Sequence, residues 1–231
     1  MPAGDVAVDV TTEPSMAPRQ PTFALPTAAR PEVLPLYFTY PSPFAYLAWH
    51  RITTHPERYR RVRMRWTPIL FRRLMDLSGG PSGGSPPLQL EYNYADAERW
   101  ARLYGVPFAA PHRADPTNQA AHKIHLLAQD AGDAWEARWM AAMHRFVRVD
   151  GHDPTDERAL LDLGRGLGVP GVESIRDPRL DERLEANTQQ ALRDRVCGVP
   201  FVRWNGEAYW GNDRLVWLEA HLAGKAGPEG V

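Results

Sequence analysis

The chain has 231 residues and a mass of 26.0 kDa, enough for one large domain or two small ones, and its formal charge of −1 excludes recruitment to nucleic acid by bulk charge. The longest apolar run, residues 44–49, is far shorter than a membrane span. Because Cys197 is the only cysteine, an internal disulfide, a four-cysteine zinc site and a CxxC redox pair are also excluded.

Residues 1–33 form a proline-rich N-terminal segment without a period of 2 or 3.6, so we expect it to be disordered or loosely draped. It lacks the basic start and apolar stretch of a secretory signal. Its acidic residues Asp5, Asp9 and Glu13 precede the first arginine, which is unlike a mitochondrial presequence. We therefore expect a cytoplasmic protein.

A strand, a helix and a second strand follow. Residues 34–40 are rich in β-formers and end at Pro41, after which Ser42-Pro43 has the form of a helix N-cap followed by proline at the first helical position. The following segment is apolar on nearly every face, which predicts a buried helix. Residues 61–66 alternate arginine with apolar side chains, the pattern of a half-buried strand. This order predicts a right-handed parallel βαβ unit.

The next part of the chain is helical. Periodicity predicts helices over residues 93–105, 117–131, 133–149, 155–164 and 178–195, with a Gly/Ser-rich loop at 78–85. Residues 199–204 then predict a strand, Asn205-Gly206 a tight turn, 207–210 its antiparallel partner, and the stripe of Leu215, Leu218 and Leu222 a last helix. We predict an α/β fold of the thioredoxin-like type (residues 34–70 and 196–225) with a large all-helical insertion (71–195).

Three other features favour structural interpretations. His122 and His125 share a helical face, but without a third ligand they predict a solvated or partly packed pair and no metal site. The five arginines of residues 58–65 resemble a nucleic-acid surface, but the alternation over 61–66 explains the last three as the solvent face of a strand, and few aromatic residues lie between them. Cys197 is expected to be a small buried core residue, with an oxidation-sensitive thiol as the alternative.

Two end motifs resemble a known family. The segment YFTYPSPFAYLA (37–48) resembles the opening motif of the 2-hydroxychromene-2-carboxylate isomerases and the related kappa-class glutathione transferases, which have a DsbA-like thioredoxin fold. The pair GVPF (198–201) and WGNDRL (210–215) resembles their closing motif, YADAERWARLYGVPF (94–108) is similar to a middle segment, and residues 114–118 match a following loop more loosely. The resemblance spans residues 34–223.

Each candidate site residue has a possible functional role and a purely structural alternative. Ser42 stands where a helix start can stabilise a thiolate, and a serine there can only donate a hydrogen bond to the sulfur of another molecule; alternatively it is only a helix cap. From the residues alone, the Val199-Pro200 bond is expected to be an ordinary trans bond. The resemblance implies a cis bond instead, with the Val199 backbone pairing the cysteinyl part of glutathione. Asn212 and Asp213 are either capping residues or ligands for the γ-glutamyl carboxylate and ammonium.

The resemblance implies a glutathione-dependent isomerase, a homodimer without nucleic-acid or membrane partners, acting on a carboxylated aromatic or enone small molecule. Glutathione is the implied cofactor and no metal is needed. The alternatives are a kappa-like transferase or peroxidase, and a redox-dead thioredoxin-like binding protein. Two departures from the family pattern bear on the substrate. Arg72-Arg73 either meets a ligand carboxylate or closes the pocket, and the loop 78–85 is either a lid or slack.

Overall fold

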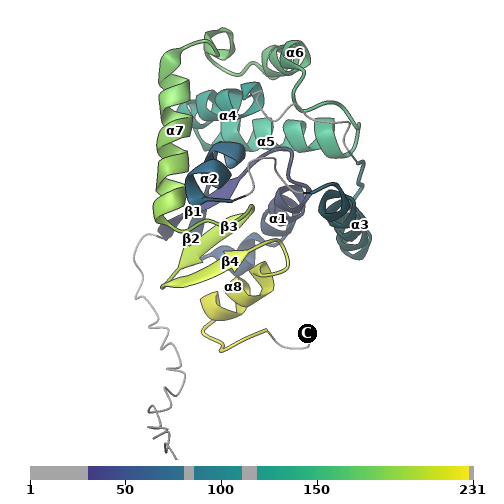
Figure 1. Ribbon diagram of the computed structural model, residues 1–231, viewed down its shortest axis with the longest axis vertical. Helices are drawn as coiled ribbons and strands as arrows, with labels where there is room; N and C mark the ends of the chain where they lie inside the picture. The colour runs from purple at the N-terminus through teal and green to yellow at the C-terminus, as the bar shows by residue number, and fades with distance from the viewer. Residues whose placement is uncertain (1–30, 81–85, 111–118, 229–231) are drawn as a thin grey trace, which may run out of the picture.

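The computed structural model describes residues 31–80, 86–110 and 119–228, and it has a mixed four-stranded sheet at its centre (Figure 1). The strand order is β2-β1-β3-β4, built from β1 (Glu32–Phe38), β2 (Val62–Pro68), β3 (Phe201–Trp204) and β4 (Glu207–Trp210). β1 and β2 are parallel, whereas β3 is antiparallel to both of its neighbours. The expected thioredoxin-like order is confirmed, with the first strand starting and ending two residues earlier than predicted.

β1 lies inside the sheet and is covered on both faces. Leu34, Leu36 and Phe38 point into the large core formed with α1 (Pro43–Thr54) and the helical region, whereas Tyr37 packs into a smaller core on the other face. Burial on both faces explains why this strand does not alternate between apolar and polar residues. In β2, by contrast, Arg63 and Arg65 are exposed and Val62 and Trp66 are buried, as the alternating pattern predicted.

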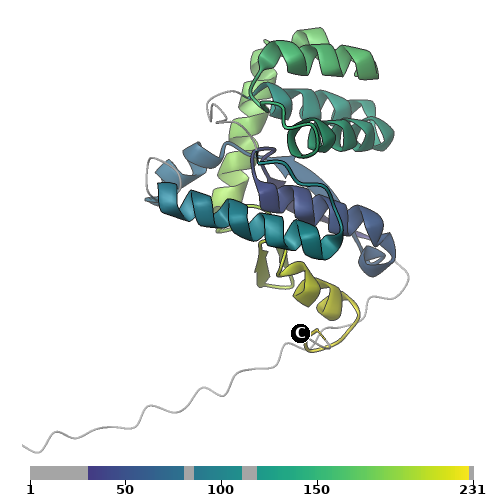
Figure 2. The same cartoon turned by 90° about the vertical axis from the view of Figure 1, so that its right-hand side faces the viewer.

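The remaining helices cover the sheet and extend it at one end. They are α2 (Phe71–Ser78), α3 (Pro87–Tyr104), α4 (Ala120–Ala131), α5 (Asp133–Arg148), α6 (Glu157–Leu167), α7 (Pro178–Arg193) and α8 (Leu215–Leu222). In Figure 1, α4, α5 and α6 gather at the top, α7 runs down one side and α8 lies at the opposite end of the molecule. Figure 2 shows α3 alongside α1, and the two helices are in contact.

The predicted helices correspond to α3 through α7, but α3 begins six residues earlier than expected. α2 is missing from the predicted set, because eight residues give little more than two turns of periodicity. Buried residues of the sheet, α1, α4, α5 and α8 form one continuous cluster. The segment 1–30 and residues 81–85 of the Gly/Ser-rich loop lie outside the described residues, as does the loosely matching motif at 114–118.

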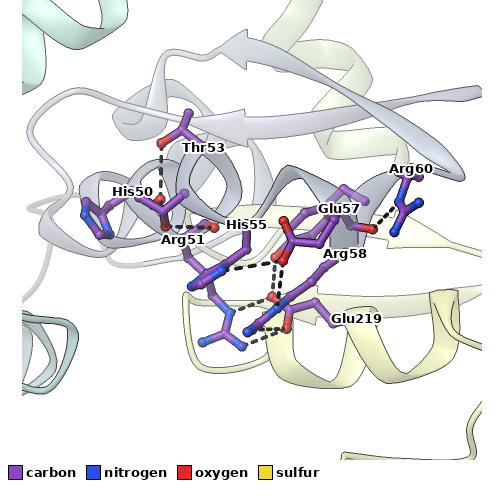
Figure 3. A network of polar contacts seen from close by, with 10 residues as sticks. His50, Arg51, Thr53, His55, Glu57, Arg58, Arg60 and Glu219 are labelled. Carbon is purple, nitrogen blue, oxygen red and sulfur yellow. Dashed lines mark hydrogen bonds and ion pairs between the residues drawn. The ribbon is translucent and has the colours of Figure 1, made fainter.

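The C-terminal part of the fold is held by a largely buried carboxylate on α8, that of Glu219. Glu219 accepts both Nε and Nη2 of Arg51 at 2.6 and 2.7 Å, Nη1 of Arg58 at 3.1 Å and the hydroxyl of Tyr59 at 2.6 Å. Figure 3 shows Arg51 and Arg58 converging on Glu219. These donors hold the pKa of Glu219 below its usual value although burial opposes that shift. The network joins the end of α1 to α8, and so fixes the helix that follows the closing motif.

Two expectations about single residues are wrong. His122 and His125 are buried, not solvated or partly packed, because α4 is enclosed by the sheet and the neighbouring helices. His125 is hydrogen-bonded to the Tyr40 hydroxyl at 2.9 Å, whereas neither ring nitrogen of His122 has a partner. Cys197 is exposed and not part of the core, because it lies in the loop before β3. No helix in the described ranges combines the length and apolar character that crossing a membrane requires.

Candidate active site

Ser42 caps α1, as predicted from the Ser-Pro pair. Its Oγ accepts the N–H of Ala45 at 3.3 Å and donates to the carbonyl of Val199 at 3.3 Å. Both contacts are long for hydrogen bonds to a hydroxyl, so the hydroxyl can be redirected at little cost. The N–H groups of Ser42 and Tyr46 are engaged and Pro43 has none, whereas the N–H of Phe44 finds no partner in the described part of the chain. A free donor and the positive end of the helix dipole therefore meet at this point.

The Val199–Pro200 bond faces this helix start and is cis, which confirms the expectation drawn from the resemblance. The carbonyl of Val199 receives the Ser42 hydroxyl, and its N–H has no partner among the described residues. The backbone of Val199, in the bend before β3, thus offers a donor and an acceptor beside Ser42.

The closing motif reaches the same place through the backbone. The N–H of Gly211 donates to the carbonyl of Pro200 at 2.9 Å, which puts Asn212 and Asp213 next to the Val199–Pro200 bond. Asn212 is buried and its amide Nδ2 donates to the Tyr104 hydroxyl at 3.3 Å. The Asp213 carboxylate is partly exposed and pairs with the side chain of Arg214.

Neither Asn212 nor Asp213 caps the last helix. α8 begins at Leu215, its N-cap is Arg214, and no side chain caps it. The expectation that these two residues stand at the helix start is therefore wrong by two residues, because they occupy the turn between β4 and α8. Their side chains make no capping bond to α8, although the Asn212 carbonyl accepts the N–H of Leu215 at 3.3 Å.

Two glycines let these segments approach each other. A Cβ on Gly198 would lie 2.3 Å from Nε1 of Trp210, so only glycine allows the indole to lie against the loop that leads to Val199. Gly211 has a φ of +94°, and a Cβ there would lie 2.6 Å from Oδ1 of Asp213. The glycines of the two family-like motifs are thus explained by contacts between the motifs themselves.

Comparison with known proteins agrees with this geometry. A family model described as a DSBA-like thioredoxin domain matches residues 33–223. A curated 2-hydroxychromene-2-carboxylate isomerase of Pseudomonas sp. (strain C18) is 30% identical over 199 residues, which cover 83% of this chain and 91% of that protein. The chain belongs to the 2-hydroxychromene-2-carboxylate isomerase branch of the DsbA-like thioredoxin family.

Two further relatives support this membership. A solved structure of a 2-hydroxychromene-2-carboxylate isomerase superposes with a TM-score of 0.71 at 27% identity, over 83% of this chain and 94% of that one. A glutathione S-transferase kappa 1 of Caenorhabditis elegans is 22% identical over 195 residues, or 78% of this chain and 85% of that protein. The chain is thus an enzyme of isomerase type, as its motifs implied.

Two residues near the site of this isomerase were not identified from the sequence. Tyr104 ends α3 and receives the amide of Asn212. Arg148 ends α5, is completely buried, and donates from Nη2 to the carbonyl of Pro41, the residue before Ser42. A sequence signal for Arg148 exists, because it continues the spacing of four from Met140 and His144, both buried, on one face of α5. An arginine on an apolar helix face is the exception worth noting.

The remaining candidates lie on the exposed side of α2 or in the core. On the exposed side of α2, the guanidinium of Arg73 stands 3.5 Å from the Glu185 carboxylate. Arg72 is also exposed. Within the described residues, no group of three or more His, Cys, Asp or Glu side chains is arranged to hold a metal ion. His122 and His125 thus remain residues of the core.

Proposed function

We propose that this isomerase uses glutathione to interconvert the cis and trans forms of a carboxylated aromatic or enone substrate of the 2-hydroxychromene-2-carboxylate kind. The observation that carries the proposal is the contact between Ser42 and Val199. This contact places the Ser42 hydroxyl, with no cysteine beside it, against the backbone of Val199. The Val199 carbonyl accepts only a long hydrogen bond from Ser42, and its N–H has no partner among the described residues.

The residues present fit the tripeptide. A cysteinyl unit has one N–H and one C=O, and the Val199 backbone offers the complementary C=O and N–H. The γ-glutamyl end carries an ammonium and a carboxylate, which suit the Asp213 carboxylate and the Asn212 amide. Among the described residues, the only thiol is Cys197, which lies in the loop before β3 and not at the position of Ser42. The arrangement therefore favours an external sulfur over disulfide exchange.

Bound glutathione supplies a thiolate that can add reversibly to an electron-poor double bond and so permit rotation about it. The part of Ser42 in this chemistry is a change of hydrogen bond. In the free protein its hydroxyl donates a hydrogen bond to the Val199 carbonyl. With a cysteinyl N–H on that carbonyl, the hydroxyl would donate to the sulfur instead. The Ala45 N–H stays on Oγ and holds the hydroxyl in place, while the free Phe44 N–H and the helix dipole favour the anion.

The test is glutathione binding and thiolate formation in a Ser42→Ala variant. Wild type should bind glutathione and show ultraviolet thiolate absorbance near neutral pH, and the variant should show much less. Because the substitution also removes a helix cap, about 1 kcal/mol of stability is expected to go with it. Asp156→Ala is the matched control, since Asp156 caps α6 in the same manner, accepting the N–H of Ala159 at 3.1 Å. Absence of glutathione binding in wild type would refute the proposal.

A kappa-like transferase is the second candidate, favoured by the similarity to the Caenorhabditis elegans protein. The two activities differ in the fate of glutathione. An isomerase returns it after each turnover, whereas a transferase or peroxidase consumes it. Measurement of free thiol during the conversion of 2-hydroxychromene-2-carboxylate therefore separates them, and a fall in thiol that matches product formation would overturn the isomerase proposal.

We also propose a homodimer in the cytoplasm. Large apolar side chains of α3, among them Leu88, Tyr92 and Leu103, are more than half exposed, and contact with a second copy would cover such a surface. Sedimentation analysis tests the dimer, and a Leu88→Ser, Leu103→Ser double variant should shift it toward monomer. A monomeric wild type would exclude it.

A further inference from the structure

The only described arginine that is completely buried stands directly behind the candidate active site. Arg148 is 0% exposed, and its Nη2 donates to the carbonyl of Pro41. Its Nε and Nη1 have no hydrogen-bond partner of normal geometry among the described residues, although Tyr94 favours the charged form of the guanidinium. The guanidinium carbon lies 6.0 Å from the ring centre of Tyr94 and 5.7 Å from that of Phe108, so aromatic faces surround the charge.

Within the described residues, this cation has no ion-pair partner. No carboxylate in the described parts of the chain forms an ion pair with Arg148, and the titratable groups that face it are Tyr46 on α1, Tyr94 on α3 and His144 on its own helix. Burial lowers the pKa of Arg148 to about 10, so it remains charged at neutral pH. His144 stays neutral there, because burial and the nearby Arg148 charge lower its pKa to about 3. A buried charge with neither an ion-pair partner nor a full set of acceptors is costly and calls for a compensating anion.

We propose that the missing anion is the thiolate bound at Ser42, and that Arg148 is the positioning residue that lowers the pKa of that thiol. The inference rests on the proposed function. The Pro41 carbonyl that Arg148 holds belongs to the peptide unit joined to Ser42, so the guanidinium is anchored one peptide unit behind the hydroxyl that meets the sulfur.

The Arg148 charge and the dipole of α1 both stabilise a thiolate at Ser42, and the Arg148 charge is the larger of the two. A helix start contributes about half a positive charge, whereas the guanidinium contributes a whole one in surroundings from which water is largely excluded. The hydrogen bond to Pro41 also orients the turn over residues 39–42, in which the Ser42 N–H donates to the Thr39 carbonyl at 3.1 Å. Loss of the charge should therefore raise the pKa of the bound thiol, by about one unit for a cation that is near but not in contact.

The experiment compares three variants by ultraviolet titration of bound glutathione. Arg148→Gln keeps a donor for Pro41 but removes the charge, and Arg148→Lys keeps the charge. Arg145→Gln removes a charge from the exposed side of the same helix, where Arg145 pairs with Asp150. We expect the thiol midpoint to rise by about one pH unit in Arg148→Gln, and to change by less than a third of that in Arg148→Lys and Arg145→Gln. If Arg148→Gln fails to fold, Arg148→Met takes its place, because apolar residues of similar volume often replace a buried charge well.

Two glutathione analogues separate the charge effect from a structural one. Glutathione sulfonate, with a permanent anion at the sulfur, should bind the neutral Arg148 variant about tenfold more weakly than it binds wild type. S-methylglutathione, which has no charge on sulfur, should bind both equally. An equal loss of affinity for both analogues, or an unchanged thiol titration midpoint in Arg148→Gln, would overturn the role of Arg148. Failure of wild type to bind glutathione at all would instead overturn the proposed function.

Discussion

Asp213 gives the sharpest test of how the γ-glutamyl end of glutathione would be recognised. Asp213→Asn removes the charge and keeps the shape of the side chain. Because the residue caps no helix, and its ion pair in the described structure is with the exposed side chain of Arg214, we expect the free energy of unfolding to change by less than about 0.5 kcal/mol.

The size of the affinity loss follows from two opposing contributions. A charge-assisted hydrogen bond to an ammonium is worth about 1.5–3 kcal/mol. In the free protein the carboxylate already pairs with Arg214, and an ion pair as exposed as this one is worth about 0–1 kcal/mol, which binding must displace. The net loss is therefore about 0.5–3 kcal/mol, or roughly two- to 150-fold in Kd.

The same reasoning predicts the opposite sign for the neighbour. Arg214→Gln removes the competitor for the carboxylate and should strengthen glutathione binding by up to about fivefold. Calorimetry with glutathione, and with an analogue lacking the α-amino group, measures both effects. The analogue should bind wild type and Asp213→Asn almost equally. If Asp213→Asn keeps full affinity for glutathione but loses several degrees of thermal stability, Asp213 is a structural residue and the assignment is wrong.

Three further predictions concern stability and are checked by thermal and urea unfolding. Glu219→Gln should cost about 3 kcal/mol and lower Tm by about 6–12 °C, since it leaves the nearly buried guanidinium of Arg51 without its counter-charge. The exposed Glu57→Gln should cost less than about 0.5 kcal/mol, and similar losses in the two variants would contradict the network. Burial lowers the pKa of His122 to about 3, so as the pH falls this histidine is protonated in the unfolded chain before it is protonated in the folded protein. Stability should therefore fall as the pH drops from about 6.5 toward 3. His122→Phe should reduce this fall, and an unchanged pH dependence would argue against a neutral buried ring. Gly198→Ala should cost about 1–3 kcal/mol, because its Cβ would lie 2.3 Å from the indole of Trp210. Gly166→Ala, in α6 with open space around it, should instead stabilise the protein by about 0.5–1 kcal/mol. Equal effects of the two substitutions would refute the close approach at Gly198.

The local elements were determined by the sequence itself. The Ser42-Pro43 pair places the start of α1, the Asn205-Gly206 pair places the hairpin turn, and the leucines at positions 215, 218 and 222 are all buried as their spacing predicted. Each of these signals acts over a few residues, through a side chain bonded to nearby backbone or a stripe repeated along one helix. Nothing further along the chain is needed to fix them.

The assembly of the site was decided by the tertiary structure. Ser42 meets Val199 across 157 positions of sequence, and Asn212 meets Tyr104 across 108. The exposure of Cys197 and the enclosure of His122 depend likewise on which elements pack beside them. Burial and distant contacts are properties of the packed elements together, because the same residue pattern on a helix is compatible with several neighbours. The charge of Arg148 could be read from the sequence, but only the packed fold placed it behind Ser42, where no carboxylate of the described residues pairs with it.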